Sequence, residues 1–87
     1  MKISKDYRRR KFFGTLSDGK VVCSLFFRKL SPSVVEFYHT ETEPEFRGQG
    51  YAGQVVDAAL AWARNSNFTI VPSCTFVAFR IESGSSS

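Results

Sequence analysis

Residues 47–65 of the chain read RGQGYAGQVVDAALAWARN, a glycine-spaced stretch followed by a run with helical periodicity. Apolar side chains recur every three or four positions from residue 51 to residue 65, which predicts an amphipathic helix. Its apolar stripe consists of Val55, Val56, Ala59, Leu60 and Ala63. Gly48 and Gly50 stand at its start and let the backbone approach a ligand closely. This stretch therefore predicts a long helix with an exposed, anion-attracting N-terminus.

The residues before the helix predict an antiparallel meander of about three strands. Alternating or aromatic-rich runs lie at residues 11–16, 21–27 and 34–42. The Asp18-Gly19 pair favours the positive φ angles of a hairpin turn between the first two strands. In the third strand, the period of two places Val35, Phe37 and His39 on one face.

A fourth strand at residues 68–71 and a short second helix are expected after the long helix. Pro72 closes the strand, and Ser73 is placed to cap the helix. The helical spacing is carried by Cys74, Val77, Ala78 and Ile81. The glycine and serine residues 83–87 have nothing to bury, so we expect a disordered tail after one domain of residues 1–82. The expected fold class is α+β.

Length and composition also limit the function. A chain of 87 residues is too short to divide into two stable cores, and 43% hydrophobic residues suit one globular domain. No apolar run approaches the roughly 20 residues that span a bilayer, so no membrane partner is expected. Cys23 and Cys74 lack the spacing of a zinc site, which predicts free thiols and no metal. We expect a cytoplasmic monomer, of a size that also allows it into the nucleus.

The positive charge is concentrated near the N-terminus. Half of the twelve basic residues lie in the first eleven positions: Lys2, Lys5, Arg8, Arg9, Arg10 and Lys11. Such a cluster could bind nucleic acid or an acidic partner. A solvated, fraying terminus that leads into an edge strand is the more common explanation, so a nucleic-acid partner is not expected.

The glycine-spaced stretch has the features of a phosphate site. The first amides of a helix lack internal partners, the helix dipole adds positive potential, and Arg47 can donate charge-assisted hydrogen bonds. A plain turn is the alternative for so short a motif. Its position between a strand and an amphipathic helix favours a pyrophosphate as the ligand.

The run Arg47–Ala52 matches the pattern Arg/Gln-x-x-Gly-x-Gly/Ala. This pattern is the acetyl-CoA-binding motif of the GCN5-related N-acetyltransferases, and the chain resembles that superfamily over roughly residues 8–81. Residues 38–41 and 70–77 are similar to a minimal single-domain subgroup, the small plant and animal acetyltransferase-like proteins.

The resemblance implies that the pyrophosphate of acetyl-CoA is held by the amides of residues 48–52. It also implies that the pantetheine arm runs between strands 34–42 and 68–71. Phe46 is expected to pack beneath the loop. The complete predicted cofactor-binding set is Thr42, Glu43, Phe46, Arg47, Gly48, Gln49, Gly50, Tyr51, Ala52 and Cys74.

Two residues are candidates for catalysis. Cys74 lies at the start of the second helix, where amides stabilise a thiolate, and His39 titrates near neutrality. In one hypothesis Cys74 accepts the acetyl group and His39 is its base. In the other, the amine attacks directly, His39 or Glu41 relays its proton, and Cys74 only lines the pocket. Simple packing is an equally good explanation for each of the two.

The predicted activity is acetyl transfer from acetyl-CoA to an amine. Relative to the family, the chain lacks the Asn-Pro or His-Pro segment after the second helix and has no room for two N-terminal helices. We therefore expect an open acceptor site that suits a protein or peptide amine. Two other functions remain open, a non-catalytic acyl-CoA-binding module and a basic domain that binds nucleic acid or an acidic partner.

Overall fold

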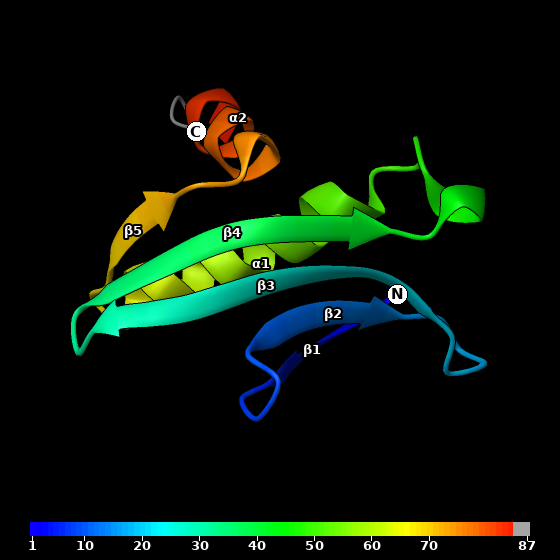
Figure 1. The fold of residues 1–87 in the computed structure, drawn as a ribbon. Helices are drawn as coiled ribbons and strands as arrows, with labels where there is room; N and C mark the ends of the chain where they lie inside the picture. The colour runs from blue at the N-terminus through cyan, green and yellow to red at the C-terminus, as the bar shows by residue number, and fades with distance from the viewer. Residues whose placement is uncertain (85–87) are drawn as a thin grey trace.

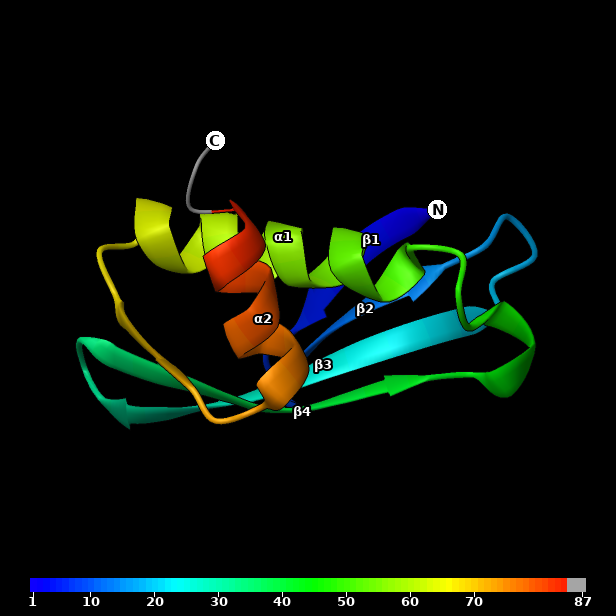
Figure 2. The same ribbon diagram turned by 90° about the horizontal axis from the view of Figure 1, so that it is seen from above.

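The computed structural model describes residues 1–84, which form one sheet and two α-helices (Figure 1). The elements in chain order are β1 (Lys2–Asp6), β2 (Lys11–Thr15), β3 (Val21–Ser31), β4 (Val34–Thr42), the 3-10 helix η1 (Pro44–Phe46), α1 (Tyr51–Asn65), β5 (Thr69–Pro72) and α2 (Thr75–Gly84). Both helices lie on the same side of the sheet, and α2 stands beside α1 at the β4 and β5 edge (Figure 2). The predicted α+β class is confirmed.

The sheet has the strand order β1-β2-β3-β4-β5. The first four strands pair antiparallel, whereas β5 runs parallel to β4. β5 pairs only with Val34–Phe37, the first part of β4. Among the residues that the structure describes, no strand pairs with this edge of β4 from Tyr38 to Thr42, so the pairing of β4 with β5 ends before the loop that precedes α1.

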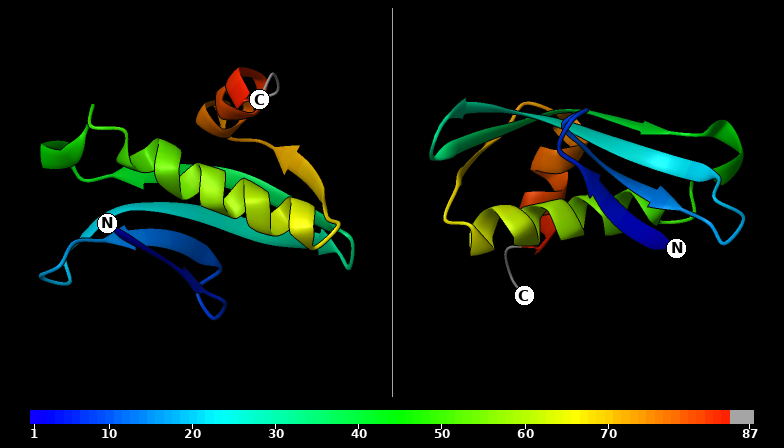
Figure 3. Two further views of the ribbon diagram at one scale, coloured as in Figure 1. Left: turned by 180° about the vertical axis from the view of Figure 1, so that it is seen from behind. Right: turned by 90° about the horizontal axis from the view of Figure 1, so that it is seen from below.

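The core lies between the sheet and α1, which crosses its inner face (Figure 3). The predicted helix bounds are confirmed, and every residue of the predicted apolar stripe is buried, together with Gly53. Phe37, Leu25, Val35 and Val22 contribute the largest buried side chains from the sheet. Because the sheet and α1 share this core, the N-terminal end of α1 is held at a fixed position beside the end of β4.

The N-terminal residues are more ordered than expected. Lys2–Asp6 form the edge strand β1, paired with β2 over its whole length, so the prediction of a fraying terminus is wrong. Residues 2–6 are few and mostly polar or charged, and Ile3 is their one apolar side chain, so their pattern did not indicate a strand. The strand β1 is held by its hydrogen bonds to β2, and a local sequence pattern contains no information about such pairing.

The C-terminal part differs from the expectation in detail. The fourth predicted strand is β5, shifted by one residue, and the second helix begins at Thr75 rather than at Cys74. The Ser73 hydroxyl donates to Glu36 of β4 instead of capping the helix. Of the predicted disordered tail, Ser83 and Gly84 belong to α2, and residues 85–87 lie outside the described part of the chain.

A β-bulge in β4 overturns one predicted face. Phe27 pairs with Phe37 and Phe26 pairs with His39, so Tyr38 is an extra residue without a partner on β3. An extra residue reverses the alternation that follows it. Val35 and Phe37 are buried as predicted, but His39 lies on the opposite, exposed face, and Thr40 takes its place on the inner face.

Within the described residues, no helix is long and apolar enough to cross a bilayer. Both cysteines are free thiols. Cys23 is fully buried, and burial raises its pKa above the usual value even though a hydrogen bond with the backbone of Gly14 acts in the other direction. A thiol in this environment is a packing residue.

Candidate functional site

The loop between β4 and α1 is built around two left-handed glycines. Gly48 and Gly50 have φ angles of 78° and 81°, and a Cβ added at either position would meet nothing within 4 Å. The glycines are therefore needed for backbone conformation rather than for space inside the protein. Gly50 occupies the N-cap position of α1 without a side-chain capping bond, so the first turn of the helix is left open.

The amides of this loop form a row of donors without protein acceptors in the part of the chain that the structure describes. Among residues 1–84, no protein acceptor is recorded for the amides of 48–53, and the first hydrogen bond of α1 runs from Gln54 N to the Gly50 carbonyl at 3.2 Å. Unpaired amides at a helix N-terminus attract anions. A phosphate or pyrophosphate fits this row of donors.

Side chains hold the loop in place from both sides. Arg47 Nε donates to the Thr42 carbonyl at 3.3 Å, and Gln49 Nε2 donates to the Glu45 carbonyl at 3.3 Å. Lys20 forms an ion pair with Glu45 and so joins the β2–β3 turn to η1. The Glu45 carboxylate raises the pKa of Lys20, which keeps this ammonium protonated.

Phe46 packs against the core and meets the Tyr51 ring at 6.1 Å, edge to face. This contact places Phe46 against the first residue of α1.

Two adjoining cavities open next to the loop. One is a groove of about 650 Å³ that follows the free edge of β4 and is lined by His39, Thr40, Glu41, Thr42, Glu43, Arg47, Ala52 and Phe76. The other, of about 210 Å³, lies at the start of α1 and is lined by Thr42, Phe46, Arg47, Gly48, Gly50, Tyr51, Ala52, Gly53 and Phe76. Thr42 and Phe76 border both, so the loop and the strand edge form one continuous depression.

The free edge of β4 offers backbone groups to this groove. Glu43 N donates to the Val22 carbonyl of β3 at 2.9 Å. Because backbone groups alternate between the two sides of a strand, the amides and carbonyls of Thr40 and Thr42 point away from β3, into the groove. An extended, amide-containing ligand can pair with them as an added strand would.

Cys74 lies beside the groove and contacts Thr40, one of its lining residues, but does not itself line either cavity. Its amide donates to the Phe37 carbonyl at 3.1 Å, and its carbonyl accepts from Ala78 of α2 at 3.0 Å. Cys74 Sγ is 3.0 Å from Thr40 Oγ1. Partial burial acts to raise the pKa of Cys74, but the Thr40 hydroxyl and the amides of Val77 and Phe76 outweigh it, so the pKa is lowered.

The structure does not bring His39 and Cys74 together. The His39 ring stacks on Phe26 with centroids 5.8 Å apart, and its Nε2 is 3.1 Å from Glu41 Oε1, on the exposed outer face. Within residues 1–84, no recorded hydrogen bond joins His39 to Cys74. His39 and Glu41 border the same groove, so a role in proton transfer through solvent remains compatible with their positions.

Sequence reasoning missed Thr40, which contacts Cys74 directly. Only the register shift at Tyr38 turns Thr40 toward the groove, and no pattern in the sequence reports it. Phe76 borders both cavities, whereas Phe79 is 61% exposed and borders neither.

The fold and the site together define a domain that presents helix N-terminal amides beside an open strand edge. Comparison with known proteins identifies that class. The family described as GCN5-related N-acetyl-transferase matches residues 11–84, which is most of the chain. The chain therefore belongs to the GCN5-related N-acetyltransferase family. No curated protein matches it.

Two solved structures share the fold. A GCN5-like protein from Staphylococcus aureus has a TM-score of 0.73 and 24% sequence identity, and the alignment covers 98% of this chain and 81% of that one. Ard1 from Thermoplasma volcanium has a TM-score of 0.62 and 22% identity over 71% of this chain. The chain spans only 41% of the length of Ard1.

Proposed function

We propose that the protein transfers an acetyl group from acetyl-CoA to an amine. The observation that carries this proposal is the row of unpaired amides at residues 48–53, which opens onto a groove along the free edge of β4. Family membership supports the same chemistry. The loop amides and Arg47 would hold the pyrophosphate, and the backbone of Thr40 and Thr42 would pair with the pantetheine arm.

The thioester of a cofactor bound in this way would lie near Cys74 and Thr40. Attack of a neutral amine forms a tetrahedral intermediate whose oxygen is negative, and a backbone amide facing the groove can stabilise it. The departing CoA thiolate needs a proton, and groups that stabilise a thiolate at Cys74 also suit a thiolate leaving group. In this proposal the residues bind and orient the substrates and stabilise the developing charges, as direct transfer of the acetyl group requires.

The acceptor is proposed to be an amine on a protein or peptide. The groove lies at the molecular surface, and within residues 1–84 the other side of the sheet carries no helix that would enclose a small substrate (Figure 3). Such a site can receive a flexible extended segment more readily than a small molecule that must be buried.

Gly50→Asp tests the loop. The aspartate adds a Cβ in a left-handed position and a negative charge at the proposed phosphate site, so CoA affinity should fall at least about tenfold. Gly19→Asp is the matched control, because Gly19 has a φ of 87° and open space around its Cβ. It lies in the β2–β3 turn, which meets η1 through the Lys20–Glu45 pair but does not line the two cavities beside the glycine loop.

Calorimetric titration with CoA measures both variants. Gly19→Asp should retain wild-type affinity. Equal affinity of wild type and Gly50→Asp would contradict the assignment of the pyrophosphate to this loop.

The route of transfer can be separated from binding. We expect Cys74→Ala to bind CoA with little change, and to lose activity strongly only if an acetyl-cysteine forms. Rapid quench of the wild type with acetyl-CoA, followed by mass spectrometry of the intact protein, detects that adduct. An adduct that also forms in Cys74→Ala would point to another nucleophile.

A non-catalytic acyl-CoA-binding module is a second candidate, favoured by one observation. Cys74 and Thr40 contact each other, but no histidine or carboxylate of the described residues is recorded in contact with Cys74. A pure binder would show saturable CoA binding and no transfer to a mixed pool of peptide amines under any conditions tested.

A further inference from the structure

A separate cavity of about 380 Å³ lies at the opposite end of α1 from the glycine loop. It is lined by Tyr7, Arg10, Phe27, Lys29, Trp62, Ser66 and Phe68. Trp62 follows Gly50 by twelve positions of helix, which corresponds to about 18 Å along the axis. The cavity is therefore distinct from the proposed CoA groove, and its size is within the range of small-molecule sites.

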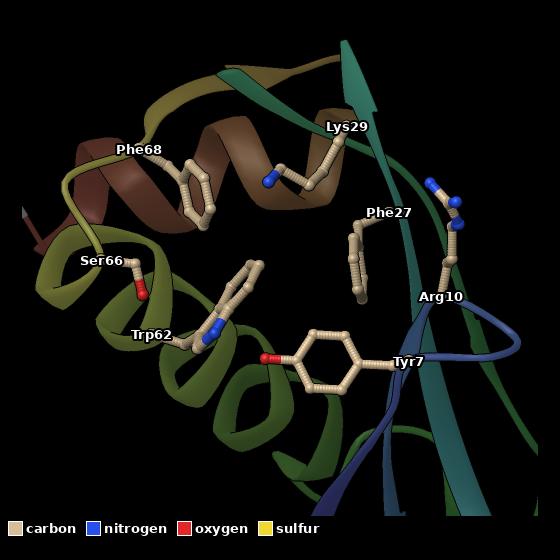
Figure 4. Close-up of a pocket in the computed structure, with 7 residues that line it drawn as sticks. All are labelled: Tyr7, Arg10, Phe27, Lys29, Trp62, Ser66 and Phe68. Atoms are coloured by element: carbon tan, nitrogen blue, oxygen red, sulfur yellow. The ribbon is translucent and has the colours of Figure 1, made fainter. Parts of the chain in front are cut away.

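The walls of this cavity are aromatic. Figure 4 shows the rings of Tyr7, Phe27, Trp62 and Phe68 arranged around the open space. Trp62 meets Phe68 with centroids 5.1 Å apart and Phe27 at 5.4 Å. Tyr7, on the β1–β2 turn, is 66% exposed and stands at the mouth. Aromatic rings around an open space can pack against a flat ligand ring, and the Lys5 and Lys29 ammonium groups that lie over Trp62 and Phe68 add positive charge at these rings.

The polar groups of the cavity are cationic. Figure 4 shows the Lys29 ammonium directed toward the space between the rings and Arg10 at its rim. No carboxylate lines the cavity, and among residues 1–84 no ion pair is recorded for Arg10 or Lys29. Lys5 Nζ adds a third cation, 4.6 Å from the Trp62 ring centroid and 4.0 Å from that of Tyr7.

The turn that carries Arg10 is held in an uncommon conformation. Arg10 has a φ of 55°, and its carbonyl accepts a hydrogen bond from Phe27 N at 2.9 Å. Left-handed backbone is costly for a side chain of this kind, so the bond to β3 must hold it. The bond fixes the β1–β2 turn next to Phe27 and thereby keeps the cavity open on that side.

We propose that this cavity binds a small flat aromatic ring that carries one carboxylate or phosphate group. The ligand ring would pack among Trp62, Phe27 and Phe68. Lys29 Nζ, which lies 4.7 Å from the Phe68 ring centroid, and Arg10 at the rim would meet the anion. An uncharged ring would leave these cations without a counter-charge, and a free inorganic anion would leave the aromatic walls without a partner. The combination of aromatic walls and cations, with no carboxylate lining the cavity, accounts for both chemical features of the ligand.

Trp62 supplies a direct reporter, because it is the single tryptophan of the chain. Its indole Nε1–H gives one resonance in a two-dimensional ¹H–¹⁵N spectrum of the whole protein. The probes are two aromatic anions, phenyl phosphate and phenylacetate. The controls are benzyl alcohol, which has the ring but no charge, and inorganic phosphate, which has the charge but no ring. Both aromatic anions should shift this resonance saturably, and benzyl alcohol and inorganic phosphate should each bind at least about tenfold more weakly.

Substitutions distinguish binding in this cavity from a general attraction of anions to the positively charged protein. Lys29→Gln should weaken binding of the aromatic anions about fivefold or more, and Lys29→Arg should retain it. Lys11→Gln removes a cation outside the cavity, stacked on Phe13, and should change nothing. Gly50→Asp should also bind normally, so failure of the CoA proposal would leave this result untouched.

The relative affinity of phenyl phosphate and phenylacetate identifies the preferred anion. The proposal is overturned if neither aromatic anion moves the indole resonance at about 10 mM, a concentration well above a millimolar dissociation constant. It is equally overturned if benzyl alcohol or inorganic phosphate binds as well as they do, or if Lys29→Gln and Lys11→Gln have the same effect.

Discussion

At the residue scale, the environment of Cys74 combines opposing influences. Partial burial favours the neutral thiol, whereas the Thr40 hydroxyl and nearby amides favour the thiolate and prevail. The thiolate is therefore populated at lower pH than in an ordinary cysteine, which increases reactivity near neutral pH. Cys23 has the opposite balance, because burial dominates and raises its pKa.

Thr40→Val should raise the pKa of Cys74, because it removes a hydrogen bond to the thiolate and leaves the burial in place. The pH profile of Cys74 alkylation should move to higher pH, and the rate near neutral pH should fall about fivefold. Iodoacetamide labelling followed by peptide mass spectrometry measures the rate, and Cys23 should remain almost unlabelled.

Thr69→Val is the control for this experiment, because Thr69 is an exposed residue of the neighbouring strand β5 and does not contact Cys74. An unchanged alkylation profile in Thr40→Val would mean that helix amides alone set the reactivity of Cys74.

At the scale of elements, an ion pair between Arg80 and Asp57 joins α2 to α1 beside Gly53. Arg80 donates to both carboxylate oxygens of Asp57, with Nε to Oδ1 at 3.0 Å and a second bond of 2.6 Å. A Cβ at Gly53 would lie 3.1 Å from the Arg80 Cζ, so the absent side chain lets the guanidinium lie against α1. The Asp57 carboxylate raises the pKa of Arg80. This pair fixes the angle at which α2 leaves Cys74.

Asp57→Asn should lower the free energy of unfolding by about 0.5–1 kcal/mol, since the pair is bidentate but partly exposed. Urea unfolding measures the change, and the difference from wild type should shrink at high salt. Arg80→Gln and the double variant complete a cycle that isolates the pair. Additive effects of the two substitutions would mean that the pair contributes no coupling.

At the scale of the whole molecule, one small core must hold every element in place. A domain of this size is marginally stable, so a ligand that binds only the folded state changes stability measurably. CoA at about 100 times its dissociation constant should add about 2.7 kcal/mol to the free energy of unfolding and raise the melting temperature by roughly 11–22 °C.

Thermal unfolding with and without CoA tests this expectation on the intact protein. A tenfold loss of affinity in Gly50→Asp should remove about half of the increase, and a larger loss should remove more, whereas Gly19→Asp should keep it. A rise of equal size in both variants would mean that CoA stabilises the protein from a place other than the glycine loop.

Local features of the chain were enough to predict much of this fold. The period of the apolar stripe in α1, the turn at Asp18-Gly19 and the glycine-spaced motif at Arg47–Ala52 each depend on residues close together in sequence. Helix formation, tight turns and unpaired helix amides are local properties of the backbone, so the sequence alone indicates them.

Pairing between distant segments decided the rest. The bulge at Tyr38 arises from the fit of β4 to β3, and it turns Thr40 toward Cys74 and His39 away from it. The aromatic cavity likewise needs the β1–β2 turn, β3 and the end of α1 to meet. The sequence by itself determined β2 to β5, the two α-helices and the glycine-spaced motif, but not β1. Only the tertiary structure decided which side chains face one another, because strand register depends on packing between segments that no local pattern records.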